Sequence, residues 1–247
     1  MNNTVKITTI MLSLFLLSSL PSLAKVTHHK AHGIPESKDF QVWVNNNEVF
    51  TGHAGGLRWP YSFCRFDFDE PVTVRVKALR SIKWLNILPS ILGVEHKTID
   101  DYTFEFKLEK PEDLSFFLNN DKRHVLHVLT NSPETERPNP GEKNVLYYKG
   151  GETYEIGVLD LEDNQTLYLE SGARLKGMVR IKDAINVRIM GRGMIDGSDN
   201  KAKCSGRDCD EPWRMIYMDN SENIRIEGIT VFNSLKWTIH PYACKNL

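Results

Sequence analysis

Short segments that alternate apolar and polar residues run along the first half of the chain. FQVWVN, YSFCRFDFD, VTVRVKAL, DYTFEFKLE and HVLHVLT either alternate in this way or are rich in β-branched and aromatic residues, as β-strands are. Clusters of turn-forming residues separate them, at 45–47, 69–71, 110–112 and 119–121. The spacing predicts a compact antiparallel β-sandwich over residues 39–130.

A polar segment, NSPETERPNPGEKN, then interrupts the pattern at residues 131–144. Its three prolines, its glycine and its charged residues do not suit a strand, and they are typical of a connection between domains. We therefore expect a linker here.

Beyond the linker, a repeat led by asparagine replaces the simple alternation. Asn164, Asn186, Asn223 and Asn246 each precede apolar residues at alternate positions, at steps of 22, 37 and 23 residues. The long step contains the polar insert SDNKAKCSGRDCDEPW. Repeats of this length predict a right-handed parallel β-helix over residues 145–247, with the insert as a loop and the asparagines in a side-chain ladder. A second antiparallel sandwich is the alternative.

The last repeat, which begins at Asn246, contains two residues. We therefore expect the β-helix to be truncated, with only its first coils in this chain. The fold class predicted for the whole chain is all-β, a β-sandwich followed by the first coils of a right-handed parallel β-helix.

The N-terminal residues resemble an export signal. Lys6 precedes the apolar run ITTIMLSLFLLSSL, and small residues at positions 22 and 24 fit a cleavage site after Ala24. We expect residues 1–24 to be a signal peptide and the protein to be secreted or periplasmic, without a membrane anchor after cleavage. A retained anchor is the alternative.

The mature N-terminus would then be residues 25–38, which include His28, His29 and His32. We expect this segment to be flexible; metal capture by the histidines is the alternative. The net charge of −1 gives no indication of a nucleic-acid partner.

Four cysteines are too few for a disulfide scaffold, and none of them stands at the spacing of a zinc site. Cys204 and Cys209 flank a short step within the polar insert. They form either a local disulfide or a pair of reduced loop residues.

Three stretches resemble family 28 of the glycoside hydrolases, the polygalacturonase group. They are GRGMIDGS at 191–198, EPWRMIYMDNSENIRIEGITVFNS at 211–234 and WTIHPYACKNL at 237–247. Members of the family carry a Gly-x-Gly-x-Ile-Asp-Gly stretch, Asn-led coils and a Trp-x-Ile-His segment. The dextranase-type family 49 shares the architecture. The resemblance extends over residues 144–247, and the sandwich is similar to accessory domains of bacterial relatives.

The resemblance implies inverting hydrolysis of a glycosidic bond in an acidic polysaccharide such as pectin or polygalacturonate. Such a reaction requires carboxylates on both sides of the bond, about 6.5–9.5 Å apart. The family motifs that supply them, Asn-Thr-Asp, Gly-His-Gly and the substrate-binding Arg-Ile-Lys, do not occur in this sequence, and the one Asp-Asp pair lies in the sandwich. We therefore expect no catalytic residue in this chain and no activity from it alone.

Three residues are candidates for substrate binding. Trp237 offers an apolar face on which a sugar ring can stack, and His240 can donate a hydrogen bond or charge to a carboxylate. Arg214 either clamps a carboxylate or lies at the surface. Packing at a corner of the coil is the alternative for Trp237 and His240.

Further acidic residues accompany these candidates. The resemblance implies that Asp196, within the Ile-Asp-Gly stretch, is a turn residue. The acidic residues of the insert could hold calcium, but they lack a fixed ligand spacing and a solvated loop is expected (Asp199, Asp208, Asp210 and Glu211). No metal and no cofactor is expected.

Two other functions stay open: a non-catalytic carbohydrate-binding or cell-surface protein, and a polysaccharide lyase. The sequence leaves undecided which polysaccharide is bound, whether action is endo or exo, and the oligomeric state.

Overall fold

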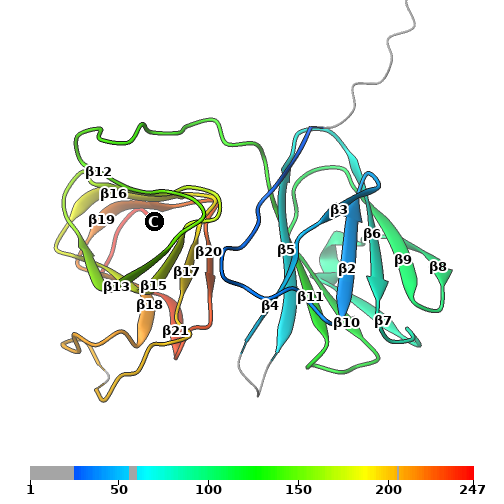
Figure 1. The fold of residues 1–247 in the computed structure, drawn as a ribbon. Coiled ribbons are helices and arrows are strands. Elements are labelled where there is room, and N and C mark those ends of the chain that lie inside the picture. The colour runs from blue at the N-terminus through cyan, green and yellow to red at the C-terminus, as the bar shows by residue number, and fades with distance from the viewer. Residues whose placement is uncertain (1–24, 56–59, 205) are drawn as a thin grey trace, which may run out of the picture.

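The computed structural model describes residues 25–55, 60–204 and 206–247. Nearly all regular structure in these residues is β-strand (Figure 1). The expected signal peptide, residues 1–24, lies outside the described residues. Within them, no helical element has the length and apolarity that a bilayer crossing requires.

The N-terminal half forms a β-sandwich of two sheets, with its core between them. One sheet orders its strands β1-β5-β11-β10-β7, with β4 also paired to β5, and the other orders them β3-β2-β6-β9-β8. The bounds are β1 Val26–His28, β2 Phe40–Val44, β3 Asn47–Val49, β4 Thr51–Ala54, β5 Tyr61–Phe68, β6 Val72–Ala78, β7 Leu85–Leu88, β8 His96–Asp100, β9 Thr103–Leu108, β10 Leu114–Leu118 and β11 Val125–Asn131, with a 3₁₀ turn at Ser90–Leu92.

The alternation in the sequence explains this packing. In β6 each residue with a buried side chain is followed by an exposed one, so Val72, Val74 and Val76 face the core and Thr73, Arg75 and Lys77 face water. Nearly all pairings are antiparallel, as predicted, but β11 runs parallel to β5.

The expectation of a flexible segment at residues 25–38 is wrong. Val26–His28 pair with β5, and His29 and Ala31 are buried against the rest of the protein. The reason is that β1 satisfies backbone groups at the edge of β5, while Ala31 packs in an apolar cluster with Phe63 and Phe232.

The C-terminal half is a parallel β-helix. One sheet orders its strands β12-β14-β16-β19 and the other β20-β17-β15-β18-β21, with β13 also paired to β15, and every pairing between these strands is parallel. The bounds are β12 Val145–Tyr148, β13 Thr153–Leu161, β14 Thr166–Leu169, β15 Arg174–Lys182, β16 Ile185–Gly191, β17 Met194–Asp196, β18 Arg214–Asp219, β19 Glu222–Ile226, β20 Thr230–Phe232 and β21 Trp237–Tyr242. The apolar core lies inside the coil.

The asparagine ladder predicted from the repeat is confirmed. Asn186 Nδ2 donates to Asn164 Oδ1 at 3.1 Å, Asn223 Nδ2 to Asn186 Oδ1 at 3.1 Å, and Asn246 Nδ2 to Asn223 Oδ1 at 2.9 Å. All four residues have φ between 52° and 59°, a left-handed conformation that asparagine adopts more readily than most residues. The chain thus bends at the same residue in each coil.

A buried polar network and an apolar cluster join the two halves. Asp67 of β5 accepts hydrogen bonds from Arg192 Nε, the shorter at 2.7 Å, and its Oδ1 lies 3.0 Å from His29 Nε2. Arg65 contacts the Arg192 carbonyl oxygen, and burial lowers the pKa of Arg65 to about 10. Since these groups are nearly inaccessible to solvent, the pairs between them are little screened. They hold the sandwich against the β-helix.

Candidate functional site

The three predicted binding residues lie on two neighbouring strands, β18 and β21. The parallel register places Arg214 beside Trp237 and Tyr217 beside His240. Ile216 and Met218 of β18 belong to the core of the β-helix. We call the neighbouring group of side chains the β18–β21 face; Trp213, Arg214, Tyr217 and Asp219 are its buried members, and Trp237, His240 and Tyr242 of β21 complete it.

Aromatic rings surround His240 on this face. Its ring centroid lies 5.4 Å from that of Trp237, at an interplanar angle of 30°, and 5.6 Å from that of Tyr217. Trp237 is 57% exposed in this chain. An exposed indole beside an imidazole suits a ligand that has both an apolar face and polar groups.

Arg214 is buried, which rules out the surface alternative. It is 1% exposed, and its guanidinium carbon lies 3.3 Å from the ring centroid of Tyr217 and 4.3 Å from that of Trp213. Burial is the main cause of a lowered pKa for Arg214, and interactions with Tyr217 and Asp219 oppose it. The cation is therefore held by aromatic rings, which compensate only part of its lost hydration.

Several polar atoms of the face have no partner among the described residues. Nε and Nη2 of Arg214, Nε1 of Trp213 and Nδ1 of His240 are all buried without a hydrogen bond. Leaving such groups unpaired costs about 1–3 kcal/mol each, and more for a charged group. The arginine and tryptophan atoms are donors, so an anionic oxygen is the complementary group.

A disulfide-closed loop lies against one side of the face. The sequence left open whether Cys204 and Cys209 are bridged; the structure joins them, with their Cα atoms 5.7 Å apart. Between them, Arg207 donates to both oxygens of Asp219 at 2.8 and 2.9 Å, and its guanidinium carbon lies 4.7 Å from the Tyr242 ring centroid. The loop is thus fastened to both strands of the face.

The carboxylates near the face are engaged in ion pairs. Asp219, which is fully buried, also accepts from the Tyr217 hydroxyl at 2.9 Å. Burial by itself would raise the pKa of Asp219, but the bonds from Arg207 and Tyr217 outweigh it and lower the pKa. Asp160 accepts from Arg180 at 2.9 Å, and Asp210 contacts the same guanidinium. These carboxylates are arranged for structure, since each already has a cationic partner.

The other acidic residues singled out from the sequence also have protein partners. Asp196 is buried and accepts from Arg174, Ser198 and Asn233, in keeping with a turn role. In the insert, Asp199 contacts Lys176. Glu211 accepts from backbone N–H groups of its own loop, and Asp208 is exposed. Among the described residues, one cluster has metal-ligand spacing, Glu211 with Cys204 and Cys209, and the disulfide consumes both thiols.

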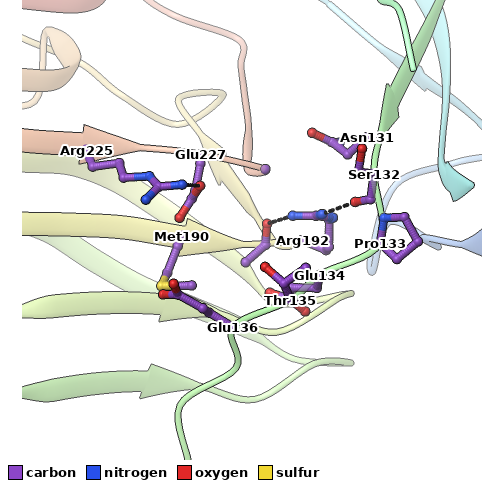
Figure 2. Close-up of a pocket in the computed structure, with 12 residues that line it drawn as sticks. Asn131, Ser132, Pro133, Glu134, Thr135, Glu136, Met190, Arg192, Arg225 and Glu227 are labelled. Carbon is purple, nitrogen blue, oxygen red and sulfur yellow. Dashed lines mark hydrogen bonds and ion pairs between the residues drawn. The ribbon is translucent and has the colours of Figure 1, made fainter. Parts of the chain in front are cut away.

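A separate cavity of about 250 Å³ lies on another side of the β-helix, between the linker and strands β16 and β19 (Figure 2). An ion pair and a hydrogen bond join residues of its walls: Arg225 donates to Glu227 at 2.6 Å, and Arg192 donates to the Ser132 carbonyl oxygen at 2.8 Å. This cavity lies where the linker packs across the surface of the β-helix.

The sequence did not single out Trp213 and Tyr217 as members of the site. A usable signal was present for Tyr217, because it is the one polar-tipped aromatic residue in the apolar run RMIYM. The unpaired donors depend on packing between coils, which the sequence alone does not reveal.

No protein-family model matches the chain, and no curated protein matches it. Among solved structures, it is similar to Dex49A from Penicillium minioluteum, with a TM-score of 0.65 and 14% sequence identity. The alignment covers 87% of this chain and 59% of that one, so the chain spans somewhat more than half the length of its structural neighbour. At this identity the likeness establishes the class of fold, an all-β protein with a parallel β-helix.

Proposed function

We propose that this chain is part of an exported β-helix protein of the glycoside hydrolase type, and that the β18–β21 face binds an acidic polysaccharide. The sequence resemblance to family 28, whose architecture family 49 shares, supports the hydrolase class. The fold shared with Dex49A, whose name carries the number of the dextranase-type family, agrees with it.

One observation supports the proposal that the ligand is acidic. Among the described residues, two nitrogens of the buried Arg214 cation and the indole nitrogen of Trp213 have no hydrogen-bond partner. A sugar carboxylate is planar and can accept from a guanidinium and a neighbouring indole at the same time, once the side chains that cover these nitrogens move aside. Trp237, exposed beside Arg214, supplies the ring on which the sugar stacks.

Within this proposal the 247-residue chain binds without cleaving. Asp160, Asp210 and Asp219 are paired with arginines and are poorly placed to take or give a proton, whereas hydrolysis with inversion requires two free carboxylates on opposite sides of the bond. The same arrangement would serve the alternative, a binding protein without catalysis.

The test is electrophoresis through gels that contain polygalacturonate or, in parallel, dextran. We expect retardation by polygalacturonate, and at least about tenfold weaker binding by Trp237→Ala, because a stacked indole is a typical anchor. Trp84→Ala is the matched control, since Trp84 is 48% exposed on the sandwich. Equal retardation of wild type and Trp237→Ala would refute the assignment of the face, and preference for dextran would refute the acidic ligand.

A reducing-end assay on the same samples addresses cleavage. Release of reducing ends by the 247-residue chain would contradict binding without hydrolysis, and unsaturated products would indicate a lyase.

A further inference from the structure

A larger cavity, of about 560 Å³, lies where the sandwich meets the β-helix. The sandwich contributes Gly55 and Tyr61, and the β-helix contributes among others Asn200, Asn233, Ser234 and Thr238. In Figure 1, β20 of the β-helix faces the N-terminal segment and β4 of the sandwich. Its volume falls within the range of small-ligand sites, and the junction of two domains is a common place for one.

Contacts between and within the domains fix the walls of this cavity. Asn233 Oδ1 accepts from the Gly55 backbone N–H of the sandwich at 2.9 Å, and Asn233 Nδ2 donates to Asp196 Oδ1 of the β-helix at 2.9 Å. Between the domains, the rings of Phe63 and Phe232 pack with centroids 6.0 Å apart. A ligand would therefore enter a preformed site and would not have to order the residues around it.

The lining is polar but uncharged. None of the described lining residues is ionic; they offer a phenol, two amides and several hydroxyls beside apolar surface. The pKa of Tyr61 is raised, chiefly by burial, so its phenol stays protonated and can donate a hydrogen bond. Ser234 Oγ is buried without a hydrogen-bond partner among the described residues. Hydroxyl and amide groups around an aromatic ring complement the hydroxyls and the C–H face of a sugar.

The cavity adjoins the face described above. Thr238 lines it, and the next residue toward the N-terminus is Trp237, whose Cα is about 3.8 Å away along the chain. We propose that the cavity is a second saccharide subsite, built jointly by both domains, which holds the hydroxyls of one sugar unit while a neighbouring unit lies on the β18–β21 face. This inference rests on the proposed function. It makes the sandwich part of the binding site.

Ser234→Ala and Tyr61→Phe test the subsite, because each removes one hydroxyl and leaves the rest of the side chain. Titration calorimetry with polygalacturonate and with monomeric galacturonate gives the affinities. We expect each variant to bind the polymer about three- to tenfold more weakly, the loss of one hydrogen bond, with binding of the single sugar at the face unchanged. Ser90→Ala and Tyr102→Phe, both at exposed positions of the sandwich, are the matched controls.

Thermal unfolding separates binding from structure. Ser234→Ala removes a buried hydroxyl that makes no hydrogen bond with the described residues, so its Tm should not fall below that of the wild type. A lower Tm together with unchanged affinity would overturn the proposal in favour of a structural role. Equal weakening toward polymer and monomeric galacturonate would also overturn it, because the cavity would then not be a separate subsite.

Trp237→Ala in the same titrations distinguishes the two proposals. If it weakens binding while both cavity variants bind like wild type, the subsite is refuted and the proposed function stands. If the cavity variants weaken binding and Trp237→Ala does not, the cavity is a site and the assignment of the face is refuted. If neither ligand binds the wild type, both are refuted.

Discussion

The asparagine ladder allows a quantitative test of what stabilises the β-helix. Asn186 stands in the middle of the ladder, where its amide donates to Asn164 and its carbonyl accepts from Asn223, both at 3.1 Å, and its φ is 57°. Asn186→Ala removes both side-chain hydrogen bonds. It also places alanine in the left-handed region, where alanine has the steric cost of a Cβ without the side-chain amide that makes this conformation accessible to asparagine. Asn186→Gly removes the same bonds but accepts the backbone conformation.

The magnitudes follow from these two terms. Two exposed hydrogen bonds contribute about 0.5–1 kcal/mol each, and the left-handed conformation costs a residue with a Cβ about 1–2 kcal/mol. We therefore expect the free energy of unfolding to fall by about 2–4 kcal/mol in Asn186→Ala and by about 1–2 kcal/mol in Asn186→Gly.

Urea unfolding followed by far-ultraviolet circular dichroism measures both values, provided that the slope of the transition is unchanged. Equal losses in the two variants would show that the left-handed backbone carries no cost. The absence of loss in both would show that the ladder contributes no stability, and either result would refute the reasoning.

Two further predictions concern stability. Gly191→Ala should lower the free energy of unfolding by more than about 2 kcal/mol, because a Cβ there would lie 2.2 Å from the Leu169 carbonyl oxygen. Gly93→Ala is the control: there is open space around Gly93, so this variant should lose only about 1 kcal/mol. Equal Tm values for the two variants would contradict this prediction. Asp219→Asn should cost about 1–3 kcal/mol near neutral pH. The pKa of Asp219 is lower in the folded protein than in the unfolded chain, where it is near 3.9. The ionised carboxylate therefore contributes its full stabilisation above the unfolded pKa, and this stabilisation is lost as the pH falls through the folded pKa. In acid, the free energies of unfolding of the wild type and Asp219→Asn should converge. A difference that stays constant down to the acid limit would refute this assignment.

The repeat made the architecture of the C-terminal half predictable. An asparagine at each bend, with apolar residues at alternate positions after it, defines one coil, and the structure places Asn164, Asn186 and Asn223 in register. Local alternation defined the strands of the sandwich in the same way. Both signals repeat along the chain, so they can be read without knowledge of distant contacts.

Contacts between segments far apart in the sequence could not be predicted in this way. Asp67 and Arg192 are separated by 125 residues and belong to no common pattern. His29 is buried 3.0 Å from Asp67, a contact that the polar sequence of the N-terminal segment does not indicate. Arg214 was identified as a candidate, but its burial depends on how Tyr217 and Trp213 pack around it.

The buried pair of Asp67 and Arg192 has a consequence for modular exchange. A hybrid that keeps this β-helix and takes its sandwich from elsewhere would leave the Arg192 cation without a carboxylate at the junction, at a cost of about 3–5 kcal/mol. A successful graft must therefore bring an acidic residue to the position of Asp67, or replace both partners together. The two halves are therefore physically matched at this junction.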